Sequence, residues 1–290
     1  LLRIGPMSSS NILEEFLLDF DGPHFLIKEK DSRGLDPVKK AIEYQSGLNK
    51  FVNQLLDKKG IHQIRNKTLM PVTIELIDQG KRLKKLIKKH VLINDQITEL
   101  SIANLVPEIW PKNKSIMISA SSPIRDWLTF AGKELLSRRC FSFRGASGID
   151  GTLSIALGIA RIKDPLLLVT GDLSFLHDIN GWLNQEAKDI NLKILLIDNH
   201  GGNIFNRLYK NNLTNSEIEN LFLMQSSVNW QKLAEAHEIP YVNIFNLEKL
   251  KEAFQWSLSL QKSVIMRVDI NTDYEINQRE NLFKCIFNND

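Results

Sequence analysis

The sequence predicts an α/β protein whose main domain is a doubly wound parallel sheet with helices on both faces. Short apolar runs, each about as long as a buried strand, recur between residues 115 and 270. Stretches with apolar residues at helical spacing separate these runs. Glycines and polar residues follow several of the runs. Regular alternation of strand and helix is typical of a parallel sheet that helices cover on both sides.

The composition excludes several classes of protein. Of the 290 residues, 43% are hydrophobic and 24% are charged, which is ordinary for a globular protein of one large or two modest domains. A net charge of +3 is too small to indicate nucleic-acid binding. Cys140 and Cys285 are far apart and lack the spacing of a metal or redox site. No apolar run approaches the ~20 residues of a membrane span, and the start has no signal-peptide pattern.

Residues 1–90 are predicted to form part of a smaller α/β domain with a linker. The chain begins at Leu1 without Met, so we expect it to be a fragment of a longer protein. The expected elements are strands at 2–4 and 25–27 and helices at 11–20, 38–56 and 70–90. The inward positions of the last helix are predicted to be Ile74, Ile77, Leu83, Leu86 and Ile87. We expect the lysines and the arginine of this helix to form a solvated face and not a nucleic-acid surface, because aromatic residues are not interleaved with them.

Residues 91–290 are predicted to form the doubly wound domain. The expected strands are 115–119, 141–143, 165–170, 193–198, one around 244, and 263–270. The expected helices are 96–106, ending before Pro107, then 151–161, 174–189, 230–237 and 247–260. Residues 210–220 are rich in Asn and polar, so we expect a mobile loop there.

Two strand ends in this domain carry oxygen ligands. Asp172 follows the strand at 165–170, and Asn199 follows the strand at 193–198. In a right-handed β-α-β unit both ends lie at the same edge of the sheet, where such sheets bind ligands. A carboxylate, an amide oxygen and a carbonyl of the following glycines would suit Mg²⁺. Taken alone, Asp172 would more often be a helix cap, and it is the partner Asn199 that favours a metal site.

The same residues resemble those of a known enzyme family. Gly171-Asp172, followed by Asn199 after a β-α-β interval, resembles the signature of enzymes that use thiamine diphosphate (ThDP). Three flanking segments are similar to the MenD family of 2-succinyl-5-enolpyruvyl-6-hydroxy-3-cyclohexene-1-carboxylate (SEPHCHC) synthases, which act in menaquinone and phylloquinone synthesis: RGASGIDG at 144–151, GDLS at 171–174 and NHGGNIF at 199–205. The resemblance covers the whole chain but only the C-terminal half of the family.

The resemblance implies a function and a set of cofactor-binding residues. The expected reaction is the decarboxylating addition of 2-oxoglutarate to isochorismate, with ThDP and Mg²⁺, or Mn²⁺, as cofactors. The metal ligands would be Asp172, Asn199 and the carbonyl of Gly201. The other expected ThDP contacts are Ile149 beneath the bent cofactor, Gly171, Leu173 and Ser174 near the diphosphate, and an apolar wall of Ile204, Phe205 and Leu208.

Substrate binding is expected from two arginines and a serine. Both substrates carry two carboxylates, which the planar guanidinium binds through paired N–H groups. Arg125 and Arg144 follow predicted strands, and Ser121 lies four residues before Arg125, as in the family's Ser-x-x-x-Arg pattern. A surface ion pair is the commoner role of a single arginine, but both positions match the family.

The family pattern also leaves departures and alternatives. Asn11 stands where the family has a basic residue, and His200 stands where Asn is common. The pyrimidine-binding domain with its glutamate, which the family supplies across a subunit interface, is expected to lie outside this chain. The resemblance implies a homodimer or homotetramer in the cytoplasm, or in the plastid stroma of a photosynthetic eukaryote. Another ThDP enzyme of the acetolactate-synthase type and a non-catalytic cofactor-binding fragment remain alternatives.

Overall fold

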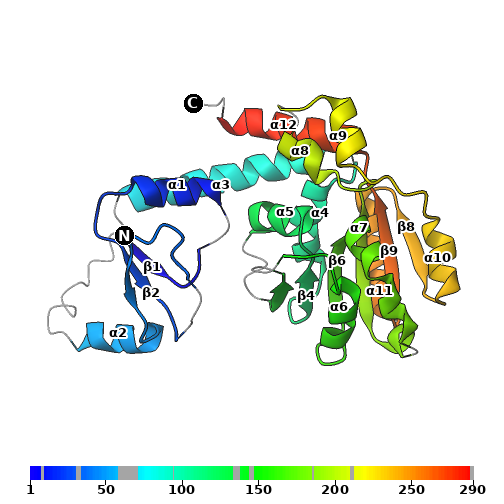
Figure 1. The fold of residues 1–290 in the computed structure, drawn as a ribbon, viewed down its shortest axis with the longest axis horizontal. Coiled ribbons are helices and arrows are strands. Elements are labelled where there is room, and N and C mark those ends of the chain that lie inside the picture. The colour runs from blue at the N-terminus through cyan, green and yellow to red at the C-terminus, as the bar shows by residue number, and fades with distance from the viewer. Residues whose placement is uncertain are drawn as a thin grey trace. The chain divides into compact units, whose positions relative to one another are not determined.

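The computed structural model of the chain describes residues 1–7, 10–30, 34–57, 71–93, 95–132, 138–143, 147–184, 186–209 and 212–287. The chain divides into two compact units, Leu1–Glu75 and Leu76–Asp290. Figure 1 labels their helices and strands.

The first unit contains a small parallel sheet. Its strands, in spatial order, are β1 (Leu2–Ile4), β2 (Phe25–Ile27) and β3 (Ile42–Tyr44). Helix α1 (Asn11–Asp19) begins where Ser10 caps it, because the Ser10 hydroxyl accepts a hydrogen bond from the backbone of Leu13 at 3.4 Å. The strands at 2–4 and 25–27 and this helix lie where the sequence predicts them.

The predicted helix at 38–56 is wrong in its first half. Ile42–Tyr44 is strand β3, which pairs in parallel with β2, and only Leu48–Leu56 is helical, as α2. Gly47 takes a φ of +80° between them, a conformation that a continuous helix does not allow. Apolar residues at 42, 48, 51, 52 and 55 fit one helical face, but that spacing does not detect the glycine break.

Helix α3 (Pro71–Val91) forms as predicted, but not all its expected inward positions are buried. Ile74, Ile77 and Leu83 are exposed. At the C-terminal end of the helix, Val91 is fully buried and Ile87 packs against the hydrophobic core of the second unit. Helical periodicity therefore identified an amphipathic helix without showing how much of its length is covered.

The second unit is built on a six-stranded parallel sheet, which confirms the predicted fold class. The strand order is β5-β4-β6-β7-β9-β8. The strands are β4 (Ser115–Ile118), β5 (Cys140–Ser142), β6 (Leu166–Gly171), β7 (Leu192–Asp198), β8 (Tyr241–Ile244) and β9 (Val264–Asp269). From β4 the chain first moves outward to β5 and then returns to β6 on the other side. The point between β4 and β6 is therefore a topological switch point, where open α/β sheets bind ligands.

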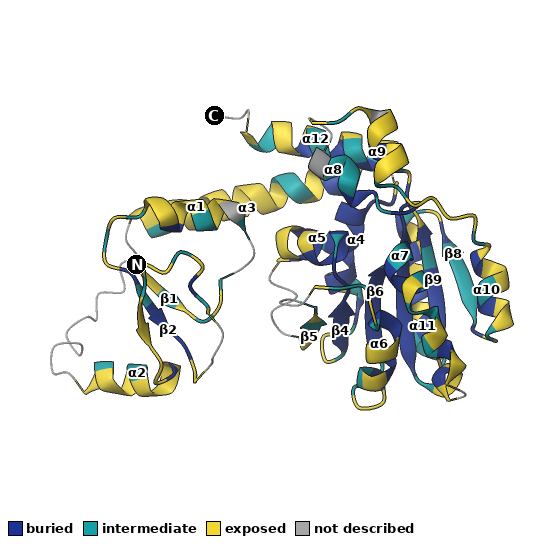
Figure 2. Ribbon diagram, in the orientation of Figure 1, coloured by how far each residue is buried: buried dark blue, intermediate teal, exposed yellow. Residues whose placement is uncertain are grey.

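Helices cover both faces of this sheet. One hydrophobic cluster joins the sheet to α4 (Glu99–Ile109), α5 (Ser122–Phe130), α11 (Leu247–Ser259) and α12 (Thr272–Phe287). The other joins the opposite face to α6 (Thr152–Ala160), α7 (Asp172–His177) and α10 (Trp230–Ala236). Alternate residues of β6 belong to the two clusters, with Leu167 in the first and Leu168 in the second. Figure 2 shows β6 and β9 buried between the two helical layers.

Three predicted segments of the second unit differ from the structure. Helix α4 begins after a capping box at Thr98 and continues through Pro107, instead of ending before it. The predicted helix at 174–189 is instead α7, which begins at Asp172, followed by two short 3₁₀ helices, η3 (Ile179–Leu183) and η4 (Ala187–Asp189). In the part of 210–220 that the structure describes, Thr214 forms a capping box that starts α9 (Asn215–Leu221) in place of a loop.

Besides α9, three described helices had no counterpart among the predicted elements, namely α5, α8 (Ile204–Tyr209) and α12. None of the described helices combines the length and the apolarity that a membrane span requires.

Candidate functional site

A cavity of about 250 Å³ opens at the switch point of the large sheet. It receives residues from the ends of β4, β6 and β7 and from the start of α8. Most of the residues that the sequence predicts for the site line it: Ser121, Ile149, Gly171, Asp172, Leu173, Ser174, Asn199, Ile204 and Phe205. The β-α-β argument therefore placed the two strand ends correctly beside each other.

Asp172 ties together the two loops that border the cavity. The residue is buried at the start of α7, and its Oδ1 accepts a hydrogen bond from the backbone of Leu173 at 2.7 Å. Its Oδ2 accepts a hydrogen bond from the backbone of Gly201, also at 2.7 Å. Burial, together with the nearby Asp198 carboxylate, raises the pKa of Asp172 to about 6, although the two N–H groups act in the opposite direction. A divalent cation at this position would favour the ionised form.

Asn199 presents the other oxygen expected of a metal site. The side chain is buried, and its Nδ2 donates to Glu99 Oε1 at 2.6 Å. Its Oδ1 is also buried and has no hydrogen-bond partner among the described residues. A buried polar atom without a partner is costly, and a bound cation would satisfy it. The donor set of Asp172 and Asn199 therefore fits a hard cation such as Mg²⁺.

The loop after Asn199 adopts a conformation that glycine permits. His200, Gly201 and Gly202 all have positive φ, at +63°, +91° and +90°. A Cβ on Gly201 would lie 1.9 Å from the carbonyl oxygen of Met224, so only glycine fits there. The Gly201 carbonyl accepts a hydrogen bond from the backbone of Met224 at 2.9 Å, which leaves its second lone pair for another partner. Asn199 and Gly202 of this loop line the cavity, whereas Gly201 between them is not among the lining residues.

The Ser174 hydroxyl makes a buried polar contact with α6. Its Oγ is 2.8 Å from Thr152 Oγ1, and Thr152 Oγ1 donates to the carbonyl of Ile149 at 2.9 Å. These contacts connect α7 and α6 to the segment that carries Ile149, at positions where the sequence predicts the diphosphate and the bent ring.

The structure describes two of the three predicted substrate-binding residues, Ser121 and Arg125. Ser121 is a non-glycine residue with a φ of +73°, and such strain is common at functional sites. Arg125 NH1 donates to the Ser121 carbonyl at 2.8 Å, and the Arg125 side chain is exposed. Arg144 lies outside the described residues, as do the side chains of Leu208 and Asn11. His200, the other departure from the family pattern, places Nε2 3.1 Å from Asp269 Oδ1.

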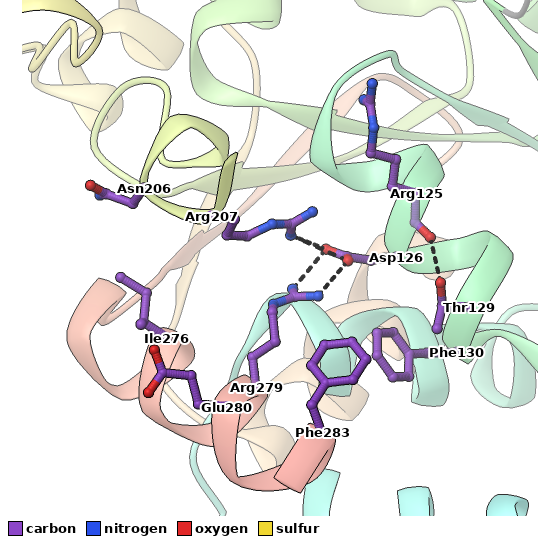
Figure 3. A pocket seen from close by; sticks show the side chains of 10 residues that line it. All are labelled: Arg125, Asp126, Thr129, Phe130, Asn206, Arg207, Ile276, Arg279, Glu280 and Phe283. Atoms are coloured by element: carbon purple, nitrogen blue, oxygen red, sulfur yellow. Dashed lines mark hydrogen bonds and ion pairs between the residues drawn. The ribbon is translucent and has the colours of Figure 1, made fainter. Parts of the chain in front are cut away.

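A buried charged cluster that sequence reasoning missed lies next to the site. Arg279 donates to both carboxylate oxygens of Asp126, at 2.8 and 3.1 Å, and Arg207 NH1 lies 3.1 Å from the same carboxylate. Figure 3 shows the two guanidinium groups converging on Asp126, whereas Arg125 points away from it. Together with Arg125 these residues line a second cavity of about 400 Å³.

The acids of this cluster have displaced pKa values. Burial raises the pKa of Glu99 to about 8, and the neighbouring Glu275 and Asp126 carboxylates act in the same direction. Burial also opposes ionisation of Asp126, but Arg279 and Arg207 outweigh it and hold the pKa of Asp126 below its ordinary value. The cluster joins α4, α5, α8 and α12, and no local sequence pattern relates these helices.

Comparison with known proteins shows which proteins this chain is similar to. Residues 131–268 match the family described as thiamine pyrophosphate enzyme, C-terminal TPP binding domain, thiamine pyrophosphate being ThDP. SEPHCHC synthases of Prochlorococcus marinus strains MIT 9301 and MIT 9515 are each 56% identical to this chain, over 99% and 100% of its length. The enzyme of strain NATL2A is 38% identical over 97% of the chain and 48% of its own length. The chain spans about half the length of the curated relatives it matches.

Proposed function

We infer that this chain, which belongs to the SEPHCHC synthase family, holds the diphosphate end of ThDP and its metal ion in such an enzyme. Asn199 carries this inference, because its buried Oδ1 lacks a partner among the described residues and lies beside Asp172 at the switch point. In domain terms, residues 1–90 would be the end of a middle domain with a linker, and 91–290 the ThDP-binding domain.

Different residues would hold the metal ion, the diphosphate and the ring of the cofactor. Asp172, Asn199 and the carbonyl of Gly201 would bind Mg²⁺, or Mn²⁺. Gly171, Leu173 and Ser174 would border the diphosphate, and Ile149 would support the bent cofactor. Bound ThDP supplies an electron sink for decarboxylation of a 2-oxo acid. Ile204, Phe205 and Leu208 would form an apolar wall that keeps water from the reacting carbon.

The substrates proposed are 2-oxoglutarate and isochorismate, joined with loss of carbon dioxide. Arg125 and Arg144 would bind substrate carboxylates, with Ser121 beside them, and their contribution would be positioning. The Arg125–Ser121 hydrogen bond supports this assignment, because it holds an exposed guanidinium at the end of β4. A homodimer or homotetramer is proposed for the whole protein.

A direct assay tests the proposal on the full native polypeptide that contains this chain. With ThDP, Mg²⁺ and both substrates, isochorismate consumption should accompany carbon dioxide release. Asp172→Ala should lower that rate by more than about 100-fold, because it removes a metal ligand. Asp189→Ala changes an exposed aspartate in the same β6–β7 connection and should leave the rate unchanged.

The possible results separate the candidate functions. Carbon dioxide release without isochorismate consumption would point to another ThDP-dependent decarboxylase or ligase and would contradict the roles of Arg125 and Arg144. ThDP binding without turnover would indicate a cofactor-binding protein. Removal of divalent cations with a chelator should abolish turnover, and Mn²⁺ or Mg²⁺ should restore it.

A further inference from the structure

A buried glutamate behind the cavity has no part in the function proposed above. Glu99 is the first residue of α4, and its side chain is 4% exposed. Its Oε1 accepts the 2.6 Å hydrogen bond from Asn199 Nδ2. The two residues lie 100 positions apart in the sequence and meet only because the fold brings α4 to the end of β7.

This hydrogen bond decides which way the Asn199 amide faces. If the amide were turned over, Asn199 Oδ1 would lie against Glu99 Oε1. This oxygen is an acceptor when Glu99 is ionised, and it stays an acceptor when Glu99 is protonated, because the Asp126 carboxylate is then the hydrogen-bond partner of the proton. Two hydrogen-bond acceptors would be in contact in either case. The two oxygens would repel each other, and the Asn199 Nδ2 donor would lose its partner. Glu99 therefore fixes Nδ2 on its own side, and Oδ1, which has no partner among the described residues, remains on the other side of the amide.

Glu99 is itself held firmly. Its backbone N–H donates to Glu275 Oε2 at 2.9 Å, and its Oε2 lies 3.4 Å from Arg207 NH1. Arg207 belongs to α8, the helix that also carries Ile204 and Phe205. The Glu275 contact thus fixes the backbone of Glu99, and Arg207 holds its side chain while Oε1 contacts Asn199.

We propose that Glu99 is a positioning residue that keeps the amide oxygen of Asn199 available to the divalent cation. The inference rests on the proposed function, since the metal role of Asn199 is part of it. Residues that orient a metal ligand through its other polar atom commonly change metal affinity by about 10–100-fold when they are removed. The same range is expected here.

The test is a titration of the full native polypeptide with Mn²⁺ in the presence of ThDP, followed by the electron paramagnetic resonance of free Mn²⁺. Glu99→Ala should raise the Mn²⁺ dissociation constant at least about tenfold. Glu99→Gln retains an acceptor oxygen and should stay within about threefold of the parent. Glu99→Asp keeps the charge but withdraws the oxygen by one methylene, so it should weaken Mn²⁺ binding as Ala does. This variant keeps the test decisive if Glu99→Ala does not fold.

Gln278→Ala is the matched control at the same end of α4. Gln278 is buried, accepts a hydrogen bond from Thr98 Oγ1 at 2.8 Å and donates to the His90 carbonyl at 3.0 Å, and among the described residues it makes no hydrogen bond to Glu99 or Asn199. This variant should lower the unfolding temperature and leave the Mn²⁺ dissociation constant within about threefold. An equal loss of Mn²⁺ affinity in Gln278→Ala, or parent-like affinity in Glu99→Ala and Glu99→Asp, would overturn the positioning role. A parent protein that binds no Mn²⁺ with ThDP would instead refute the proposed function itself.

Discussion

Asp198, the last residue of β7, holds the start of the loop that carries Asn199 and Gly201. Its Oδ2 accepts hydrogen bonds from Trp230 Nε1 at 2.7 Å and from Arg267 Nε and NH2 at 2.9 and 2.7 Å. Burial opposes its ionisation, but the Arg267 guanidinium outweighs burial and holds the pKa of Asp198 below its ordinary value. The side chains of Asp198 and Arg267 are 6% and 12% exposed, so this ion pair is largely shielded from water.

Removing one partner of this pair should be costly. Asp198→Ala leaves the Trp230 N–H without its acceptor and leaves the Arg267 charge with the more exposed Asp269 carboxylate, so it should lower the free energy of unfolding by about 3 kcal/mol. That figure is at the low end of the usual range, because the substitution also relieves repulsion with Asp172. Asp269→Ala removes a 43% exposed carboxylate 3.2 Å from the same arginine and should cost less than about 1 kcal/mol. Denaturant unfolding followed by tryptophan fluorescence measures both, and equal costs would contradict the assignment.

At the scale of elements, the sequence predicted those whose pattern is local and continuous. The apolar runs at 165–170 and 193–198 are β6 and β7, because a central strand buried on both faces is apolar throughout. Lys193 is one exception, and the structure explains it, since its Nζ donates to the carbonyls of Leu260 and Lys262 at 2.7 and 2.8 Å. The region 38–47 was predicted incorrectly, because Ile42 fits the helical spacing and the pairing of β3 with β2 is not visible locally.

The short strand β1 carries an ion pair that should make the first unit sensitive to acid. Arg3 in β1 contacts Asp36 Oδ1 at 3.1 Å, and Asp36 Oδ2 accepts a hydrogen bond from the backbone of Ala41 at 2.8 Å. Burial opposes ionisation of Asp36, but the Ala41 N–H and Arg3 outweigh it and lower the pKa of Asp36. The unfolded chain then binds a proton at a higher pH than the folded one. The stabilisation is therefore complete above about pH 4 and is lost as the pH falls through the lower folded value.

Amide hydrogen exchange of the β2 residues between pH 3 and pH 6, corrected for intrinsic exchange rates, measures this effect. Protection at Leu26 should decrease more steeply below about pH 4 in the parent protein than in Asp36→Asn, which cannot titrate. Burial and Arg3 lower the pKa of the neighbouring His24, and Asp36 acts in the opposite direction, so the titration of His24 would differ between the two proteins. Both proteins therefore carry His24→Gln, which removes this titration from the comparison. The same acid dependence in both would show that Asp36 is not responsible.

At the scale of the whole molecule, the site residues that could be predicted from the sequence are those that the strand topology alone brings together. Asp172 and Asn199 could be placed together because parallel strand ends share one edge of the sheet. Glu99, Asp126 and Arg279 could not be placed together, because their contacts join helices far apart in the sequence, as between Glu99 and Arg279, and carry no periodic signal. An acidic residue at the start of a helix, such as Glu99, has the sequence appearance of an ordinary helix-terminus charge.

The two compact units differ strongly in the apolar side chains they bury, and this difference predicts separate unfolding. Both hydrophobic clusters lie within the second unit. In the described part of the first unit, the buried apolar side chains are those of Leu17, Leu26 and Ile27. Burial of apolar surface is the main favourable contribution to folding, so the first unit should be the less stable one. Calorimetry of the 290-residue chain should therefore show two heat-absorption transitions, with the first unit unfolding at the lower temperature.

A matched pair of core substitutions assigns the two transitions. Leu26 in β2 and Leu195 in β7 are both fully buried strand residues, and replacing either with Ala should cost about 2–5 kcal/mol within its own unit. Leu26→Ala should lower or remove the first transition and leave the second in place. Leu195→Ala should lower the temperature of the second transition. The temperature of the first transition should not change, because Leu26 and Leu195 belong to different compact units. A single transition that shifts with either substitution would mean that the chain unfolds as one cooperative body, and the division into two units would then have no thermodynamic counterpart.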